Sequence, residues 1–230
     1  MKKRLLVLCA LATTLTVAIS GVARADTTLG TTAVPSGMPG SDGCGGDVIA
    51  QLTSDPSTPY TVPSPGTITS WRIRNFADPG TQLSLVVLKN TGGISYSVVG
   101  VDTHTIPNSV SDVLSFTVGS PIAVSGGEIL ALWEADDNVL CYWSLGDIPG
   151  TDVLIALDSA TTPTTGQSLT QAGTDSGGGY RLNLEANLTP PAPTPPAPPA
   201  TPKKKKKCKK KKHKRSAESA KKKCKKKKKR

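Results

Sequence analysis

Short apolar segments recur along the middle of the chain, and turn-forming residues separate them. Residues 180–188 (YRLNLEANL) alternate cleanly between apolar and polar positions, which is the period of an extended strand. Residues 82–89 (QLSLVVLK) alternate in part and end at Asn-Thr-Gly-Gly, so we expect a hairpin with residues 94–102. Strands of this kind have one buried face and one face in contact with solvent.

The same pattern predicts strands throughout the middle of the chain. β-Branched residues are frequent, Gly and Pro interrupt the segments, and the turn signals are too closely spaced for stable helices. We therefore expect residues 26–188 to form one all-β domain, a single two-layer β-sandwich of jelly-roll type. Further strands are expected at residues 48–53, 67–75, 113–118, 121–124, 128–134, 138–144 and 153–158.

Residues 1–25 have the three parts of a secretory signal peptide. A basic start (KKR) precedes an apolar run over residues 5–22, and Ala-Arg-Ala closes the segment. We predict cleavage after Ala25, which would place the mature protein outside the cytoplasm. A retained membrane anchor is the alternative, although threonine and serine residues weaken the apolar run.

The composition changes sharply after Leu188. Residues 189–202 hold eight prolines in 14 positions, so we expect a semi-rigid polyproline II linker of about 43 Å. Residues 203–230 carry 20 basic residues against one acidic residue, whereas residues 26–202 carry 4 basic and 16 acidic residues. An acidic domain thus precedes a cationic tail, which we expect to be disordered because its charges repel and it has no apolar surface to bury.

The tail is almost all lysine and contains no aromatic residue or apolar stripe. This composition favours non-specific attraction to a dense polyanion, because lysine is a hydrated point charge without planar recognition. We expect the tail to bind an anionic cell-wall polymer or a membrane surface. Extracellular nucleic acid, the acidic domain of a neighbouring copy, and a role in solubility alone are the alternatives. The expected polyanion-binding residues are Lys203, Lys204, Lys205, Lys206, Lys207, Lys209, Lys210, Lys211, Lys212, Lys214, Arg215, Lys221, Lys222, Lys223, Lys225, Lys226, Lys227, Lys228, Lys229 and Arg230.

Four cysteines remain after signal cleavage. We expect Cys44 and Cys141 to form a disulfide, because export permits one; two buried free thiols are the alternative. Cys208 and Cys224 lie among lysines, which favour the reactive thiolate. We expect these tail cysteines to pair covalently, either within one tail or between chains.

No catalytic or metal motif stands out in the domain. His104 is its one histidine, and we expect it at a surface strand end because no Gly-x-Ser-x-Gly elbow is present. Residues 134–138 (EADDN) concentrate oxygen ligands, but their spacing matches no calcium loop, so we expect an acidic turn. The SDGCGGD motif around Cys44 has the look of a nucleophile loop, yet a disulfide in a Gly-rich turn accounts for it. We therefore expect no cofactor and no metal.

A ligand platform is predicted at residues 128–144, interpreted as a hairpin whose turn is centred on Asp136 and Asp137. In that register Trp133 and Tyr142 project from the face opposite Cys141. An exposed Trp–Tyr pair on a flat sheet is suited to stacking on sugar rings. Burial of the pair under another strand or loop is the alternative.

The segments VPSPGTITSWRIR, LSLVVLKNTGGISYSVVGVD and PIAVSGGEILALW resemble a group of uncharacterised exported β-sandwich proteins of high-GC Gram-positive bacteria. The cysteine-interrupted lysine tail after a Pro-Ala linker is similar to tails in that group. The resemblance spans most of residues 48–230 and implies a secreted or wall-associated protein of jelly-roll type. It assigns no catalytic or ligand-binding residue.

These features favour a non-enzymatic exported protein that its tail retains at the cell surface or wall. An extracellular carbohydrate-binding module, which would take polysaccharide through the domain, is the alternative, and a secreted hydrolase is a third hypothesis. Glycan binding by the tail-less domain would support the second hypothesis. Turnover that is lost on mutation of His104 or of a domain carboxylate would support the third.

Overall fold

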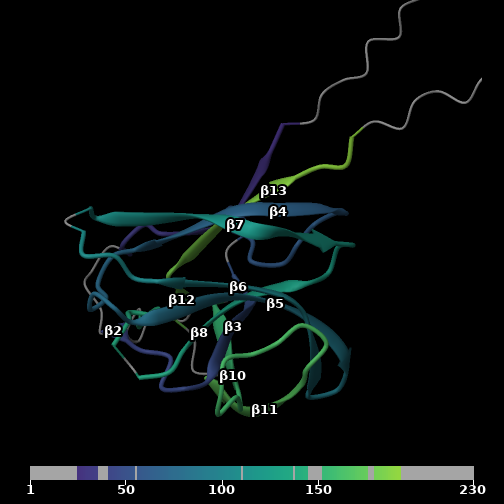
Figure 1. Cartoon of the computed structure of the whole chain (residues 1–230). Helices are drawn as coiled ribbons and strands as arrows, with labels where there is room; N and C mark the ends of the chain where they lie inside the picture. The colour runs from purple at the N-terminus through teal and green to yellow at the C-terminus, as the bar shows by residue number, and fades with distance from the viewer. Residues whose placement is uncertain are drawn as a thin grey trace, which may run out of the picture. The chain divides into compact units, whose positions relative to one another are not determined.

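The computed structural model describes residues 25–35, 41–54, 56–109, 111–136, 138–144, 152–175 and 179–192. These residues form β-strands and the turns between them (Figure 1), which confirms the predicted all-β class. No helix in this part of the chain is long and apolar enough to cross a membrane. Nearly all of the predicted signal peptide, most of the linker and the whole tail lie outside the described residues.

Four strands form an open antiparallel sheet in the order β1–β13–β4–β7 (Figure 1). Burial alternates along β4 and β7, because one face of this sheet packs on the core and the other meets solvent. The strands are β1 (Thr27–Thr31), β4 (Gly66–Arg74), β7 (Val113–Val124) and β13 (Leu184–Thr189).

Six further strands form a second antiparallel sheet that closes on itself, in the order β10–β11–β6–β5–β8–β3. The strands of this closed sheet are β3 (Val48–Thr53), β5 (Gln82–Gly92), β6 (Ser95–Thr105), β8 (Ile129–Glu134), β10 (Val153–Leu157) and β11 (Ser168–Asp175). β5 and β6 form the hairpin that the sequence predicts. A third sheet has the order β12–β9–β2 and contains β2 (Ser41–Asp42), β9 (Tyr142–Ser144) and β12 (Tyr180–Leu182).

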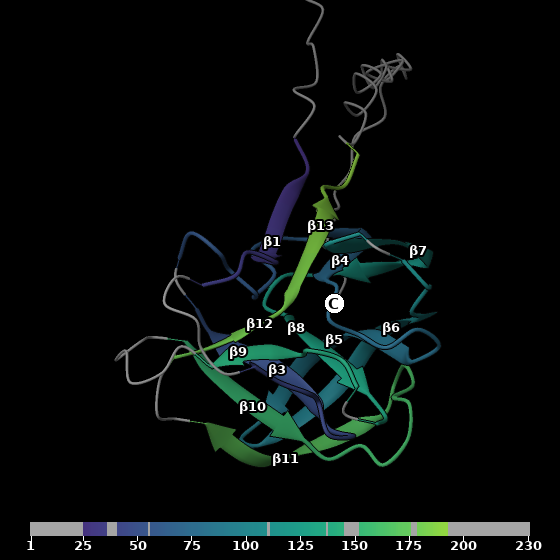
Figure 2. The same cartoon turned by 90° about the vertical axis from the view of Figure 1, so that its left-hand side faces the viewer.

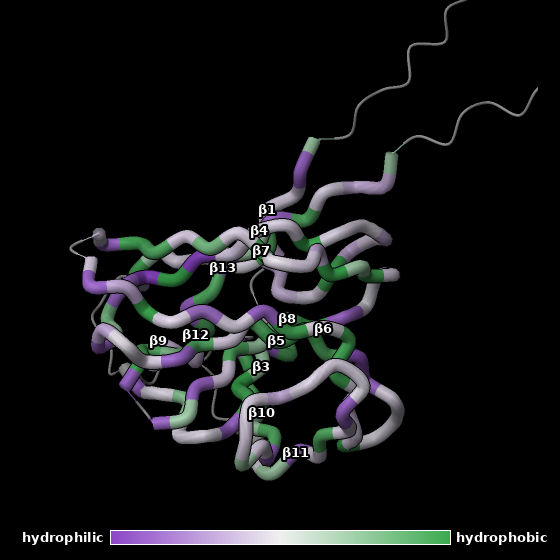
Figure 3. The backbone as a smooth tube through the Cα atoms, viewed as in Figure 1, coloured by the Kyte–Doolittle hydropathy of each residue, from purple (hydrophilic) through white to green (hydrophobic). Residues whose placement is uncertain are grey.

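Two apolar cores lie on opposite faces of β8. Leu130 and Leu132 meet residues of the open sheet in the first core. The second core fills the inside of the closed sheet, because all six of its strands contribute: Val48, Ala50, Val86, Leu88, Tyr96, Val98, Ile129, Ala131, Trp133, Ile155, Leu157 and Leu169. Every residue of β8 is therefore buried, and Figure 3 shows apolar positions, in green, gathered along β3, β5 and β8.

The hairpin predicted over residues 128–144 is wrong. β8 has β3 on one edge and β5 on the other, so Leu132 lies opposite Ile49 and Leu85. β9 pairs instead with β2 and β12. Because both edges of β8 already have hydrogen-bonded neighbours, the following segment cannot pair with it and continues to the third sheet.

The predicted sandwich is confirmed in its class, since the open sheet packs against the β5 and β8 side of the closed sheet. The closure of the second layer is not evident from the sequence. It depends on β11, which links β10 to β6. β11 reads SLTQAGTD and has a single large apolar residue, Leu169, so its pattern does not stand out as a strand.

The two ends of the domain leave from one edge of the open sheet. β1 pairs with β13, which places Thr27 opposite Leu188, and Figure 2 shows both strands extending away from the closed sheet. Gly30 permits this close pairing. Its φ is +70°, and an added Cβ would lie 2.2 Å from the carbonyl oxygen of Leu184.

Candidate functional site

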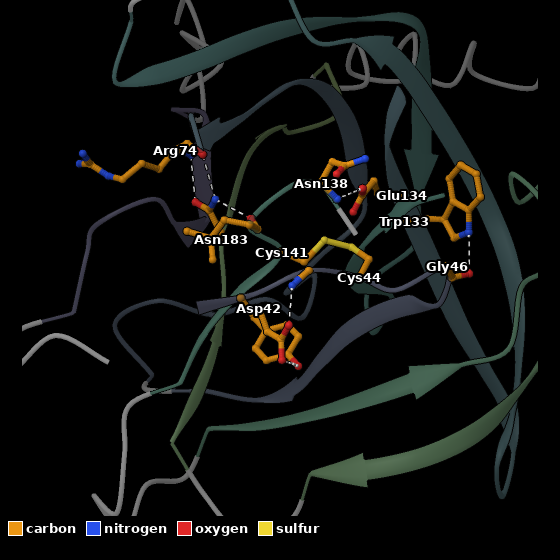
Figure 4. Close-up of a disulfide and its surroundings, with 12 residues drawn as sticks. Asp42, Cys44, Gly46, Arg74, Trp133, Glu134, Asn138, Cys141 and Asn183 are labelled. Carbon is orange, nitrogen blue, oxygen red and sulfur yellow. Dashed lines mark hydrogen bonds between the residues drawn. A yellow bond between two sulfur atoms is a disulfide. The ribbon is translucent and has the colours of Figure 1, made fainter. Parts of the chain in front are cut away.

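The predicted disulfide between Cys44 and Cys141 is confirmed (Figure 4). Cys44 lies in the Gly-rich turn before β3, and Cys141 directly precedes β9, 97 residues further along the chain. The backbone N–H of Cys141 donates to the Asp42 carbonyl at 2.9 Å, which aligns the two segments. Closing a loop of this length stabilises the fold by about 4–5 kcal/mol in the chain-entropy model.

A buried carboxyl group lies against this disulfide. A carboxylate oxygen of Glu134 and the sulfur atoms of Cys44 and Cys141 all lie within 4.8 Å of one another. Glu134 Oε1 accepts the backbone N–H of Asn138, whereas Oε2 has no hydrogen-bond partner among the described residues. Burial raises the pKa of Glu134, and the backbone N–H groups around it oppose the rise only in part.

This arrangement changes the interpretation of the EADDN turn. Glu134 is fully buried while Asp136 is exposed, so the two do not gather around one ion, and Asp137 lies outside the described residues. The cysteine sulfurs beside Glu134 are joined to each other, and a metal would need them as thiolates. Cys44, Glu134 and Cys141 are therefore not suited to hold a metal ion while the disulfide is intact.

A small hollow of about 240 Å³ opens beside Cys44. Its wall is apolar, and its polar groups are Asp42, Asp47 and Tyr142. Among the described residues that line it, none is basic. Burial, and then the nearby carboxylate of Asp158, raise the pKa of Asp47. The apolar wall consists of Ile49, Leu154, Ile155 and Ala156.

Sequence reasoning did not assign a role to the two acids of the hollow, although both stand in the SDGCGGD motif. Asp42 and Asp47 flank Cys44 at spacings of two and three residues. A disulfide in a tight Gly-rich turn brings such neighbours to one rim. Glu134 could not be found in this way, because tertiary packing places it there.

The predicted Trp133–Tyr142 platform is wrong. Trp133 is only 3% exposed, belongs to the core of the closed sheet, and donates Nε1–H to the carbonyl oxygens of Gly46 and Ser159. Its strand has a packed layer on each face, so no side of β8 meets solvent. Tyr142 alone is partly exposed; it lines the hollow and makes an edge-on contact with Tyr180 at 5.7 Å.

His104 is less isolated than a surface strand end implies. Its Nε2 lies 2.8 Å from Asp102 Oδ2, and the same oxygen accepts Nε1–H of Trp71 at 2.7 Å. The Asp102 Oδ1 atom accepts the backbone N–H of Gly119, and the His104 ring stacks on Phe116. This cluster joins β6 to β4 and β7. No hydroxyl or thiol is hydrogen-bonded to His104 in the described part of the chain; a hydrolase triad would place its nucleophile there.

The tail lies outside the described residues. This applies to all 20 predicted polyanion-binding residues between Lys203 and Arg230, and to Cys208 and Cys224.

No protein-family model matches the chain, and neither a curated protein nor a solved structure is detectably similar to it. The resemblance noted from the sequence therefore stays a prediction.

The free energy of unfolding is expected to depend on pH in opposite directions through two buried glutamates, Glu134 and Glu128. The pKa of Glu134 is raised, so its ionisation weakens the folded state as pH rises above the usual glutamate range. The Glu134→Gln variant should therefore gain stability relative to the wild type between about pH 4.5 and neutral pH. Urea unfolding over a pH series measures this difference.

Glu128 is the matched control, because its carboxylate accepts hydrogen bonds from Ser125 N, Ser125 Oγ and Gly126 N. Burial alone would raise its pKa, but these bonds outweigh burial and lower it. Glu128→Gln should cost about 1.5–3 kcal/mol at neutral pH, a loss that shrinks as pH falls below the usual range. Parallel pH profiles for the two variants would contradict these assignments.

Proposed function

We propose that the chain is an exported, non-enzymatic β-sandwich protein that its polybasic tail holds at an anionic cell surface. The observation that carries the proposal is the separation of charge along the sequence: 20 basic residues within residues 203–230, against 16 acidic and 4 basic residues within residues 26–202. An anionic surface repels an acidic domain, whereas it attracts the basic tail.

The basic side chains of the domain are few and are engaged within it. Arg72 forms an ion pair with Glu185, Arg181 pairs with Asp152, and Arg74 donates to the carbonyl of Thr32. Lys89 is the remaining cation between residues 26 and 202. Attraction to wall polymers or anionic lipids would therefore have to come from the tail.

The buried disulfide supports export. Disulfides persist in oxidising compartments and are rare where glutathione keeps thiols reduced. The bond between Cys44 and Cys141 suits a protein whose first 25 residues read as a secretory signal.

The linker keeps surface binding separate from the domain. Eight prolines in 14 residues favour polyproline II, which spans about 43 Å at this length. Near an anionic membrane each lysine contributes up to about 1 kcal/mol, so five engaged lysines give about 5 kcal/mol. The domain would then stay free to meet other molecules.

The first prediction of this proposal concerns retention. The full chain should fractionate with the cell envelope and be released by a wash in about 1 M salt, which shortens the screening length to about 3 Å. A chain that ends at Leu188 should appear in the medium. Fractionation followed by immunoblotting measures both.

A third form, with every tail lysine and arginine replaced by glutamine, controls for length and for the tail cysteines. It should behave like the truncated chain, and nuclease treatment should leave the full chain in place. Equal retention of the full and neutralised chains at low salt would contradict electrostatic tethering, and release by nuclease would indicate nucleic acid as the partner.

A carbohydrate ligand in the hollow beside Cys44 is a second candidate function. Tyr142 offers a partly exposed ring, and Asp42 and Asp47 offer hydroxyl acceptors above an apolar wall. A sugar matches both features, since its ring faces are apolar and its edges carry hydroxyl donors. The hollow, about 240 Å³, is below the roughly 300–1,000 Å³ of typical ligand pockets, so it would hold no more than about one sugar unit.

Pull-down on insoluble polysaccharides tests this second function. Tyr142→Ala should weaken binding about tenfold or more, because it removes the stacking surface and the hydroxyl that donates to Asp42. Phe76→Ala is the control, since Phe76 is an exposed aromatic residue that does not line the hollow. Equal effects of the two substitutions, or no binding by the wild type, would remove carbohydrate as the ligand.

A further inference from the structure

The Glu134 carboxyl lacks an ionic partner in a place where such a partner is expected. It is fully buried, and none of the ion pairs between described residues includes it. Burying a carboxyl group without full hydrogen bonding is costly, and groups of this kind concentrate at sites of chemistry. The bond beside it, between Cys44 and Cys141, is the reactive group within reach.

Reduction of the disulfide would supply what Glu134 lacks. In the oxidised state neither sulfur carries a proton, so the disulfide offers Oε2 no hydrogen-bond donor. Reduction separates the two sulfurs and places an S–H donor on each, beside a carboxylate oxygen of Glu134 that lies within 4.8 Å of both sulfurs in the oxidised state. The carboxyl group therefore favours the reduced pair over the oxidised pair.

The hollow distinguishes the two sulfur-bearing residues. Both cysteines are buried, at 3% and 0% exposure, but Cys44 lines the hollow and Cys141 does not. A thiol that reaches the bond from the hollow would attack Cys44, and Cys141 would carry the leaving sulfur. A thiolate in apolar surroundings is a poor leaving group, so a proton donor beside it accelerates the step.

We propose that the Cys44–Cys141 disulfide is a thiol-exchange site in which Glu134 gives its proton to Cys141. An external thiolate attacks Cys44 Sγ, the bond between the two sulfurs breaks, and its electron pair passes to Cys141 Sγ. That sulfur takes the Glu134 proton. The products are a mixed disulfide on Cys44, a Cys141 thiol and a Glu134 carboxylate, which regains a proton from solvent. Burial supports the role because it raises the pKa of Glu134 and keeps the donor protonated to higher pH.

The charge of the residues that line the hollow determines which external thiols are expected to react fastest. Asp42 and Asp47 line it, and none of the other described lining residues is basic, so cationic thiols are favoured over anionic ones. Cysteines flanked by lysine belong to this class, as Cys208 and Cys224 do by sequence. A small cationic thiol and the tail of a second copy share this chemistry.

Mass spectrometry of the folded full chain tests the proposal, with Cys208→Ser and Cys224→Ser to remove competing thiols. Cysteamine, 2-mercaptoethanol and thioglycolate are compared at equal thiolate concentration. We expect mixed disulfides on Cys44, formed fastest with cysteamine and slowest with thioglycolate, and Asp42→Asn with Asp47→Asn should bring the three rates within about twofold. The reaction rates of the peptides Lys-Lys-Cys-Lys-Lys and Glu-Glu-Cys-Glu-Glu are then compared. A faster reaction of the first peptide shows that the site also accepts a cysteine flanked by lysines.

The role of Glu134 has its own measurement. The rate of mixed-disulfide formation, divided by the thiolate concentration, should fall in the wild type as pH rises and Glu134 ionises. The Glu134→Gln variant should react at least about tenfold more slowly and without this pH dependence. If Glu134→Gln does not fold, the pH dependence of the wild type decides, and a flat profile overturns the role. If the three thiols instead open the disulfide at one common rate, equal to the unfolding rate measured by hydrogen exchange, the bond is structural only. That result overturns the whole proposal.

Discussion

The bond between Cys44 and Cys141 is the constraint on which the described site depends. It joins the turn before β3 of the closed sheet to the start of β9 in the third sheet. The strands of that third sheet have only two or three residues each, too few to be stable without a cross-link or a packed neighbour. The rim of the hollow and the surroundings of Glu134 follow from where this bond holds the chain.

The second organising feature is a strand with a core on each face. β8 contributes Leu130 and Leu132 to one core and Trp133 to the other. Its sequence, ILALWE, is nearly all apolar, which is typical of a strand buried on both sides. The sequence prediction fails here, because it treated this strand as one with alternating buried and exposed positions and therefore placed Trp133 on an exposed face. The all-β class and the β5–β6 hairpin succeed, because their alternation and turn residues are local signals.

The candidate site divides in the same way between local and tertiary information. The cysteine pair follows from counting the cysteines of a domain that the sequence predicts to be exported, and Asp42 and Asp47 stand two and three residues from Cys44 in the sequence. Glu134 follows from neither, because it reaches the disulfide only after β8 is placed between β3 and β5. β11 was missed for a related reason: its single large apolar residue, Leu169, contributes to a core that five other strands build.

Charge divides the chain into an acidic region, residues 26–202, and a basic region, residues 203–230. The domain engages its arginines internally and lines its hollow with acids, while the tail holds 20 basic residues. The proposed export to the cell surface would account for both an oxidised acidic domain and a cationic tail. There, a disulfide is stable and anionic polymers are abundant at the surface.

The most direct test of this account is a peptide mass map of alkylated protein recovered from the cells that produce it. The account predicts a mature chain that begins at Asp26, with Cys44 and Cys141 joined and protected from the alkylating reagent. A chain that retains residues 1–25, is recovered from the cytoplasm, and carries the reagent on both cysteines would contradict it.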